Sequence, residues 1–505
     1  MTKIIKSRSI IAKTYPHRGE IPMASNARKI IGGLGWSFGE RILAQGVSFL
    51  VSIVLARILA PDEFGVISLI LVFINIANVF VANGFGESLI QKKDADKTDF
   101  STVFWCGFAL SIILVLIIWV LAPFISAFYN KPELTMPMRV LSLKLILASL
   151  NSIQQAYISK HLLFRKMFFA TLIGTIISAF VGIGMAYGGL GVWALVAQYL
   201  TNSAIDTIAL AFLVKWHPEM IFSSIAAKKL IGYSWKITGA ALINELYTQI
   251  RSLIIGKVYS TADLAYYNKG NTFPQVIMTN INTAVNKVFF PVMSNYGDDR
   301  EGLKQFTRKS LKGTALITFP IIAFLIASAD KVIPFLLTEK WSFSIPYLRI
   351  LCLYWIVQPI QTTNWQVLKA SGRSDLCLKL EILKKTIGIV LVACTMFISV
   401  RALAWSSVIF AGISMIVNMI PNNSIIGYSV FEQFKDLLPI ILMTVIATLC
   451  AWSVSFVPLY YLFSIVIELV VCLGVYMLMS YFYLKSQEPE LLSTVVSKIK
   501  GLTKR

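Results

Sequence analysis

Residues 53–60 read Ile53-Val54-Leu55-Ala56-Arg57-Ile58-Leu59-Ala60, and 200 positions later residues 253–260 read Leu253-Ile254-Ile255-Gly256-Lys257-Val258-Tyr259-Ser260. Both stretches run apolar, small, basic and apolar, and an acidic residue follows each one, Glu63 and Asp263. A second echo pairs Gly191-Val192-Trp193-Ala194 with Leu403-Ala404-Trp405-Ser406 at an offset of 212. An internal repeat in an apolar chain is typical of transporters, in which one half moves against the other.

The composition predicts a membrane protein. Of the 505 residues, 56% are hydrophobic and only 14% are charged, whereas soluble domains carry about a quarter charged residues. Runs of about 20 apolar residues cross a bilayer as helices, because lipid cannot satisfy backbone polar groups. We therefore expect an all-α polytopic membrane protein with about 14 transmembrane helices. The expected spans are 34–57, 64–90, 100–124, 137–158, 167–187, 190–214, 229–256, 264–292, 310–337, 345–368, 376–399, 402–420, 437–457 and 459–484.

The repeat divides these spans into two parallel six-helix halves. An even number of helices in each copy gives both copies the same orientation in the membrane, related by an axis along its normal. The expected organisation is a basic N-terminal tail (1–30), an N-lobe of helices 1–6 (31–214), a cytoplasmic connector (215–228), a C-lobe of helices 7–12 (229–420), two extra helices 13–14 (421–484) and a basic tail (485–505).

The net charge of +21 does not indicate nucleic-acid binding. With a cytoplasmic N-terminus, Lys and Arg gather in the cytoplasmic segments, as the positive-inside rule requires, so both termini are predicted to be cytoplasmic. Six cysteines without CxxC spacing and three histidines outside the spans offer no metal site. Since no loop is long enough for a catalytic domain, we expect no catalytic residue and no enzyme.

Polar residues inside spans 1, 7 and 8 are the candidate substrate site. Isolated amides in membrane helices commonly join helices to each other, at about 0.6 kcal/mol each, and the lysines of span 8 have the alternative of extending to the membrane surface. Buried cations, in contrast, cost about 2.5–3.5 kcal/mol each at the bilayer centre, so several of them indicate a wet cavity with an anionic occupant. The candidates are Arg41, Gln45, Lys236, Asn244, Arg251, Lys269, Asn271, Gln275, Asn282 and Lys287.

Few carboxylates lie inside the spans. A carrier driven by H⁺ or Na⁺ needs a carboxylate that binds the cation in one state and releases it in the other. Glu245 is the first candidate because it lies on the repeated polar stripe, with pairing to Arg41 or Lys236 as its alternative role; Glu40 and Asp206 follow. Apart from such an ion, no cofactor is expected.

Several short motifs carry a family resemblance. They are Gly35-Trp36-Ser37, Asp62-Glu63-Phe64-Gly65, Gly84-Phe85-Gly86-Glu87-Ser88-Leu89-Ile90-Gln91-Lys92-Lys93-Asp94 and Phe290-Pro291-Val292-Met293-Ser294. In this order they resemble Wzx-type polysaccharide flippases, in the polysaccharide-transporter branch of the multidrug/oligosaccharidyl-lipid/polysaccharide (MOP) exporter superfamily.

The resemblance implies a flippase in the bacterial inner membrane. Such a protein translocates undecaprenyl-pyrophosphate-linked oligosaccharide repeat units for O-antigen, capsule or exopolysaccharide synthesis, in contact with membrane lipids, a polysaccharide polymerase and a chain-length regulator. In the family, charged residues of spans 1, 2, 7 and 8 line the cavity, which by position adds weight to Arg41, Glu245 and Arg251, with Lys269 or Lys287.

Two other classes of protein compete with this interpretation. A multidrug or small-metabolite antiporter of the same superfamily would share the layout, but a cavity for cationic drugs should be richer in acidic and aromatic groups. A membrane glycosyltransferase or polymerase would need a long outward loop with catalytic residues.

Overall fold

The computed structural model describes residues 45–82, 96–161, 163–214, 217–297, 299–457 and 460–487. Throughout these ranges the regular elements are helices, so the predicted all-α class is confirmed. In the first half these are the helix Gln45–Ile58, α3 (Pro61–Ala82), α5 (Lys97–Tyr129), η1 (Pro132–Leu134), α6 (Thr135–Ser142), α7 (Lys144–His161), α8 (Phe164–Tyr187) and α9 (Val192–Leu213). The rest are α10 (Ser224–Val258), α11 (Thr261–Ser294), α12 (Arg300–Ala327), α13 (Ala329–Leu337), η2 (Glu339–Ser344), α14 (Ile345–Ile356), α15 (Gln358–Ala370), α16 (Ser374–Thr395), α17 (Val400–Ile426), α18 (Val430–Val454) and α19 (Tyr461–Gln487).

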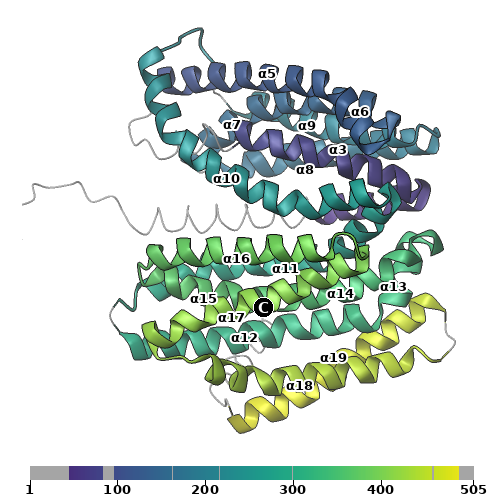
Figure 1. Ribbon diagram of the computed structural model, residues 1–505, viewed down its shortest axis with the longest axis vertical. Coiled ribbons are helices and arrows are strands. Elements are labelled where there is room, and N and C mark those ends of the chain that lie inside the picture. The colour runs from purple at the N-terminus through teal and green to yellow at the C-terminus, as the bar shows by residue number, and fades with distance from the viewer. Residues whose placement is uncertain are drawn as a thin grey trace, which may run out of the picture.

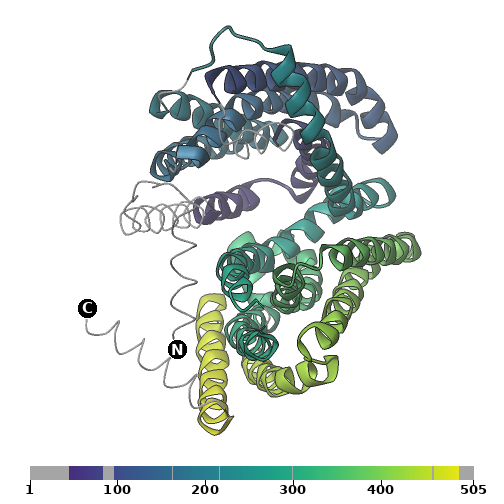
Figure 2. The ribbon, with the colours of Figure 1, turned by 90° about the vertical axis from the view of Figure 1, so that its left-hand side faces the viewer.

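The helices form two lobes. Figure 1 shows α3 and α5–α9 in the upper lobe and α11–α17 in the lower one, with the α18–α19 pair along its lower edge. Figure 2 shows the same two bodies from one end. Helix α10 packs along α3 and α5, and α11 also packs on α3. These two helices therefore join the lobes.

Local structure repeats at matching places in the two halves. The Ala60 amide donates to the Glu63 carboxylate (2.7 Å), and the Ser260 amide donates to that of Asp263 (3.3 Å). Each acidic residue thus caps the first turn of the following helix, α3 or α11, where backbone N–H groups lack partners. The acidic residue that follows each copy of the repeat has this structural role.

Some expected spans are interrupted. The span expected at 137–158 is two helices, α6 and α7, which meet at Leu143, and the span expected at 345–368 is α14 and α15, which meet at Val357. Pro359 lies in the first turn of α15, where its missing N–H is tolerated. The span expected at 310–337 ends as α12 at Ala327, and α13 is a separate short helix. Breaks therefore occur in the fourth span of both lobes.

The helix boundaries also refine the expected segments. Helix α10 begins at Ser224, within the expected connector 215–228, and α17 continues through Pro421 to Ile426, beyond the expected boundary at 420. Within the described residues, nine helical segments are long and apolar enough to cross a membrane, with α6–α7 and α14–α15 each counted as part of one segment. The long helices α10 and α11 fall outside this set because they carry many polar side chains. The count of about 14 spans stays a prediction.

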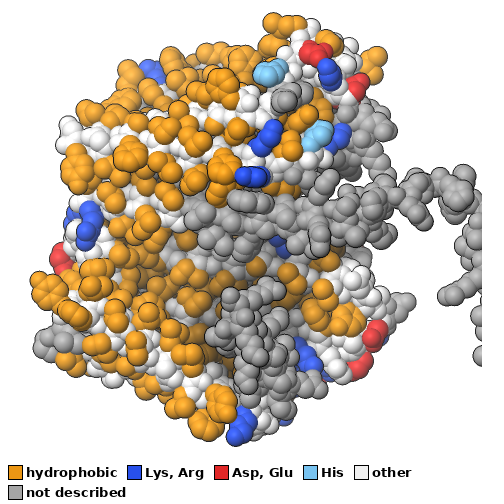
Figure 3. Space-filling view, turned by 180° about the vertical axis from the view of Figure 1, so that it is seen from behind, with side chains coloured by type: hydrophobic (Ala, Val, Ile, Leu, Met, Phe, Trp, Pro, Cys, Tyr) orange, Lys and Arg blue, Asp and Glu red, His pale blue; other side chains and the backbone are white. Residues whose placement is uncertain are grey.

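Apolar side chains cover the outer surface. The face in Figure 3 shows them spread over both lobes, and Phe124, Phe180 and Val470 are among the exposed ones. In water such a surface would aggregate, but against lipid tails it is the expected exterior. The polar groups that need an explanation are therefore those inside.

Candidate functional site

A polar cavity lies between the two lobes. Its volume is about 420 Å³, and α3, α10, α11, α14 and α17 all contribute to it. We name it the central cavity. Its lining residues are Ser68, Leu71, Val72, Asn75, Tyr247, Thr248, Gln249, Arg251, Ser252, Tyr267, Asn268, Asn271, Gln275, Leu351, Tyr354, Trp355, Ser407 and Phe410.

Arg251 is the charged residue of this lining. Two of its guanidinium nitrogens, Nε and Nη2, are buried and have no hydrogen-bond partner in the described part of the chain. A buried cation without an anion is costly. The lining contains no carboxylate to neutralise it, so an anionic ligand is the natural partner for this group.

The lining of the central cavity includes the aromatic side chains of Tyr247, Tyr267, Tyr354, Trp355 and Phe410. The indole Nε1 of Trp355 donates a hydrogen bond to Asn271 Oδ1 (2.8 Å), and the Asn271 amide donates to Gln275 Oε1 (3.2 Å). Trp355 was not among the predicted site residues. Its position on α14, beside the break at Val357, brings it to the amides of α11.

A second cation lies where α10 meets α16. Lys385 donates to Asn244 Oδ1 (3.2 Å), and the Tyr247 hydroxyl lies so close to Gly388 that a Cβ atom there would clash with it. Lys385 was not among the predicted site residues. The sequence signal that could have identified it is a pair of adjacent lysines, Lys384 and Lys385, in the middle of α16. Lys384 is different because it pairs with Glu381 at 2.7 Å.

Lys269 does not line the central cavity. Its Nζ donates to the Ser52 hydroxyl (2.6 Å) and lies 4.2 Å from the centroid of the Phe64 ring, and the side chain is buried. It therefore fills the seam between the lobes as an internal contact. The pattern of polar residues along α11 does not predict this position, because the partners Ser52 and Phe64 come from the other half of the chain.

The other predicted residues lie in different places. Arg41 and Glu40 lie outside the described residues. Gln45 Oε1 and Asn282 Oδ1 are buried without a partner, but neither lines the central cavity. Lys236 and Lys287 are exposed on α10 and α11. The structure therefore brings together Arg251, Asn271 and Gln275 of the predicted set, with Asn244 beside them.

The lobes are joined tightly at one end, which we name the latch. Arg57 donates to the carbonyl oxygens of Phe335 (2.6 Å) and Leu336 (3.0 Å) across the interface. Lys340 donates in the opposite direction, to the carbonyls of Leu59 (2.7 Å) and Arg57 (2.9 Å). Because most of these contacts are exposed to water, each contributes only about 0.5–1 kcal/mol.

The latch explains why each copy of the repeat carries a basic residue, Arg57 or Lys257, at the same position. Lys257, the counterpart of Arg57, donates to the Phe128 carbonyl and lies 4.2 Å from the centroid of the Phe128 ring. Each copy of the repeat therefore sends its basic side chain into the opposite lobe. The duplicated motif builds the closed end of the molecule.

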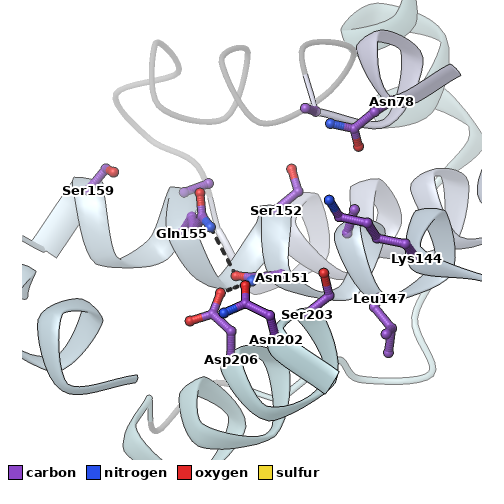
Figure 4. A pocket seen from close by; sticks show the side chains of 13 residues that line it. Asn78, Lys144, Leu147, Asn151, Ser152, Gln155, Ser159, Asn202, Ser203 and Asp206 are labelled. Carbon is purple, nitrogen blue, oxygen red and sulfur yellow. Dashed lines mark hydrogen bonds between the residues drawn. The ribbon is translucent and has the colours of Figure 1, made fainter. Parts of the chain in front are cut away.

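A second polar pocket lies within the N-lobe, between α3, α7 and α9. Figure 4 shows it, and its volume is about 360 Å³. We name it the N-lobe pocket; it is lined by Asn78, Ala82, Lys144, Leu147, Ala148, Asn151, Ser152, Gln155, Ala156, Ser159, Asn202, Ser203 and Asp206. The Asp206 carboxylate accepts hydrogen bonds from Asn151 (2.5 Å) and Thr171 (3.4 Å).

The predicted coupling residues differ in their surroundings. Asp206 faces the N-lobe pocket, whereas Glu245 accepts a hydrogen bond from Gln249 (2.7 Å) one turn further along α10 and does not line any of the described cavities. Across the described residues, no cluster of His, Cys, Asp and Glu could hold a metal ion.

Two helical lobes that are latched at one end and enclose a cationic cavity define a membrane transporter of the two-lobed type. The chain belongs to the polysaccharide biosynthesis protein family, whose model matches residues 54–346. It is 26% identical to the lipopolysaccharide biosynthesis protein WzxC of Escherichia coli K12, over 70% of this chain and 73% of that protein. It is 22% identical to the teichuronic acid biosynthesis protein TuaB of Bacillus subtilis 168, over 86% of this chain and 90% of that protein.

Comparison with solved structures gives the same fold. The lipid II flippase MurJ, in an inward closed conformation, superposes with a TM-score of 0.72 at 15% identity, over 90% of this chain and 99% of that one. The predicted resemblance to proteins of polysaccharide biosynthesis is confirmed by the family match and these relatives.

Proposed function

We propose that this protein is a flippase that moves a polyprenyl-pyrophosphate-linked oligosaccharide across the bacterial inner membrane for surface polysaccharide synthesis. A diphosphate carrying several sugars cannot cross hydrocarbon unaided. The protein supplies a cavity in which amide and guanidinium groups replace the lost water, while the polyprenyl tail stays among the membrane lipids. It acts as a carrier and not as an enzyme.

Arg251 is the observation that supports this function most strongly. Guanidinium groups bind phosphate oxygens through paired, charge-assisted hydrogen bonds, and two donors of Arg251 have no other partner. Lys385 adds a further positive charge, and its partner Asn244 lies about two turns of α10 before Arg251. The central cavity therefore suits a dianionic head group.

Alternating access follows from the latch. The cross-lobe bonds of Arg57 and Lys340 close one end of the molecule. If these bonds break while the other end closes, the central cavity opens to the opposite side of the membrane. The basic helix starts, such as Lys97 and Arg300, lie at the end away from the latch. By the positive-inside rule this end is cytoplasmic, and so are both termini.

A substitution at Arg251 tests the function. The purified protein is reconstituted in vesicles, and the flipping of a polyprenyl diphosphate sugar is measured by its accessibility to an impermeant enzyme. We expect Arg251→Gln to lower the rate by about tenfold or more, because a charge-assisted hydrogen bond contributes about 1.5–3 kcal/mol. Arg139→Gln is the matched control, since Arg139 donates to the Trp119 carbonyl at the periphery.

Either of two results would contradict the proposal. One is a wild-type protein that does not accelerate flipping, and the other is an Arg251→Gln protein that flips as fast as the control. Efflux of a lipophilic cation without lipid flipping would favour the antiporter, for which the aromatic side chains in the lining of the central cavity are the supporting observation. The polymerase and the chain-length regulator are the expected partners, and co-purification from membranes tests them.

A further inference from the structure

The N-lobe pocket differs in chemistry from the central cavity. Its lining offers four amides (Asn78, Asn151, Gln155 and Asn202) and three hydroxyls (Ser152, Ser159 and Ser203), and it contains no aromatic ring. Small-molecule sites are usually lined mainly by apolar groups with a few polar ones. Such a polar lining fits a ligand that is itself covered with hydroxyl groups.

The two cavities are neighbours. Asn75 lines the central cavity and Asn78 lines the N-lobe pocket. Residues three apart on a helix lie on the same face, about 5–6 Å from each other. One turn of α3 therefore separates these two lining residues, so the cavities lie side by side along this helix.

Size also favours an occupant shared by both cavities. The central cavity, at about 420 Å³, is at the lower end of the usual range of about 300–1,000 Å³ for drug-sized ligands. A diphosphate and a repeat unit of several sugars are larger than such ligands. The sugars farthest from the diphosphate need a second space, and the N-lobe pocket of about 360 Å³ is the adjacent one.

Hydrogen-bonding capacity in the N-lobe pocket is partly unused. The Asn78 Oδ1 atom is buried and has no partner among the described residues, and the contacts of Asn202 with Thr175 and Ser178 are long, at 3.5 and 3.4 Å. The Lys144 ammonium lies 5.3 Å from the centroid of the Tyr199 ring. Amides provide both donors and acceptors, which is what sugar hydroxyls require.

We propose that the N-lobe pocket binds the distal sugars of the lipid-linked glycan, those farthest from the diphosphate. This inference rests on the proposed function and assigns the binding of the diphosphate and of the distal sugars to different residues. Arg251 holds the diphosphate, which is common to every such lipid, while the side chains of α7 and α9 distinguish one repeat unit from another.

Filling the N-lobe pocket tests the inference. Ser152 is half-buried in the lining, and Ser152→Phe would occupy the space without removing a charge. The probes are a polyprenyl diphosphate with a single N-acetylhexosamine and the same lipid with a complete repeat unit, taken from a strain that lacks this protein. We expect Ser152→Phe to lower the ratio of long to short glycan flipping at least fivefold, since only the long glycan reaches the pocket.

A second variant protects the test against misfolding. Gln155→Ala removes an amide that donates to Asn151 (3.1 Å), and it should shift the ratio in the same direction by a smaller factor. Gln305→Ala is the matched control, because Gln305 is exposed on α12 and donates to Glu301; it should leave the ratio unchanged. Arg251→Gln should slow both lipids equally.

The outcomes separate the inference from the proposed function. If the wild type flips both lipids and neither Ser152→Phe nor Gln155→Ala changes the ratio, the inference is overturned and the flippase function stands. If both variants only change the dependence on Na⁺ or H⁺, equally for the two lipids, the pocket is an ion site alone and the inference is again overturned. A wild type that flips neither lipid contradicts the function itself.

Discussion

At the residue scale, the chain contains ionisable groups whose positions indicate different tasks. Arg251 faces the central cavity, and two of its N–H donors have no partner among the described residues. Lys269, in contrast, is enclosed by Ser52, Phe64 and Trp341. Both are cations in polar faces of predicted spans. Only their neighbours from other helices distinguish a ligand contact from a packing contact.

Asp206 is the carboxylate that we propose for coupling to H⁺ or Na⁺. It lies at the wall of the N-lobe pocket, held by Asn151 and Thr171, while Glu245 is bound to Gln249. We expect Asp206→Asn to keep the fold and to abolish the response of flipping to an imposed gradient of H⁺ or Na⁺. The amide keeps the shape but cannot bind and release the cation.

The measurement is the flipping rate in vesicles with and without each gradient. Glu245→Gln serves as the comparison. If Asp206→Asn still responds and Glu245→Gln does not, coupling belongs to Glu245, as the repeated stripe first indicated.

At the scale of elements, the approach of α3 to α11 closes the latch end. A Cβ atom on Gly65 would lie 1.8 Å from the Thr261 carbonyl oxygen, and the Thr261 hydroxyl donates to Asp62. The two helix starts can come this close only because residue 65 has no side chain. This glycine therefore sets the distance between the lobes.

Gly65→Ala should separate α3 from α11 at this point. We expect the free energy of unfolding to fall by about 1–3 kcal/mol, the usual cost of overpacking, which a lower thermal unfolding temperature in detergent would show. Gly412→Ala is the control, because a Cβ there meets nothing within 4 Å; in a helix it should be neutral or stabilising by up to about 1 kcal/mol. Equal unfolding temperatures for the two variants would show that the contact is not tight.

At the scale of the whole molecule, the latch sets the balance between the two open states. Its charged donors bind carbonyl oxygens and not carboxylates, so the bonds are strong enough to close one end yet can exchange with water. A transporter requires such a balance, because a ligand can shift only states that differ by a few kcal/mol.

The double substitution Arg57→Gln with Lys340→Gln should open the latch. We expect a cysteine introduced at Ser252, in the lining of the central cavity, to react with an impermeant thiol reagent from outside the cell several times faster than in the parent protein, in a background without the native cysteines. Lys97→Gln, which removes a surface ion pair with Glu219, is the control.

A cysteine at Lys131, beside the latch and paired with Asp62, reports the orientation. It should react from outside in every variant. Reaction only after permeabilisation would reverse the proposed topology, and an unchanged rate at Ser252 would show that the latch does not limit access.

The sequence by itself determined the helical class, the membrane environment and the duplication, because these follow from composition, periodicity and local echoes along the chain. It also identified Arg251, Asn271 and Gln275, whose polarity inside apolar spans has a cost wherever they point. Only the tertiary structure decided that Trp355 lines the central cavity, that Lys385 contacts Asn244, that Lys269 lies outside the cavity, and that Arg57 and Lys257 close the molecule. The partners of those side chains lie in the other lobe or on distant helices, and local periodicity carries no information about which helix faces which.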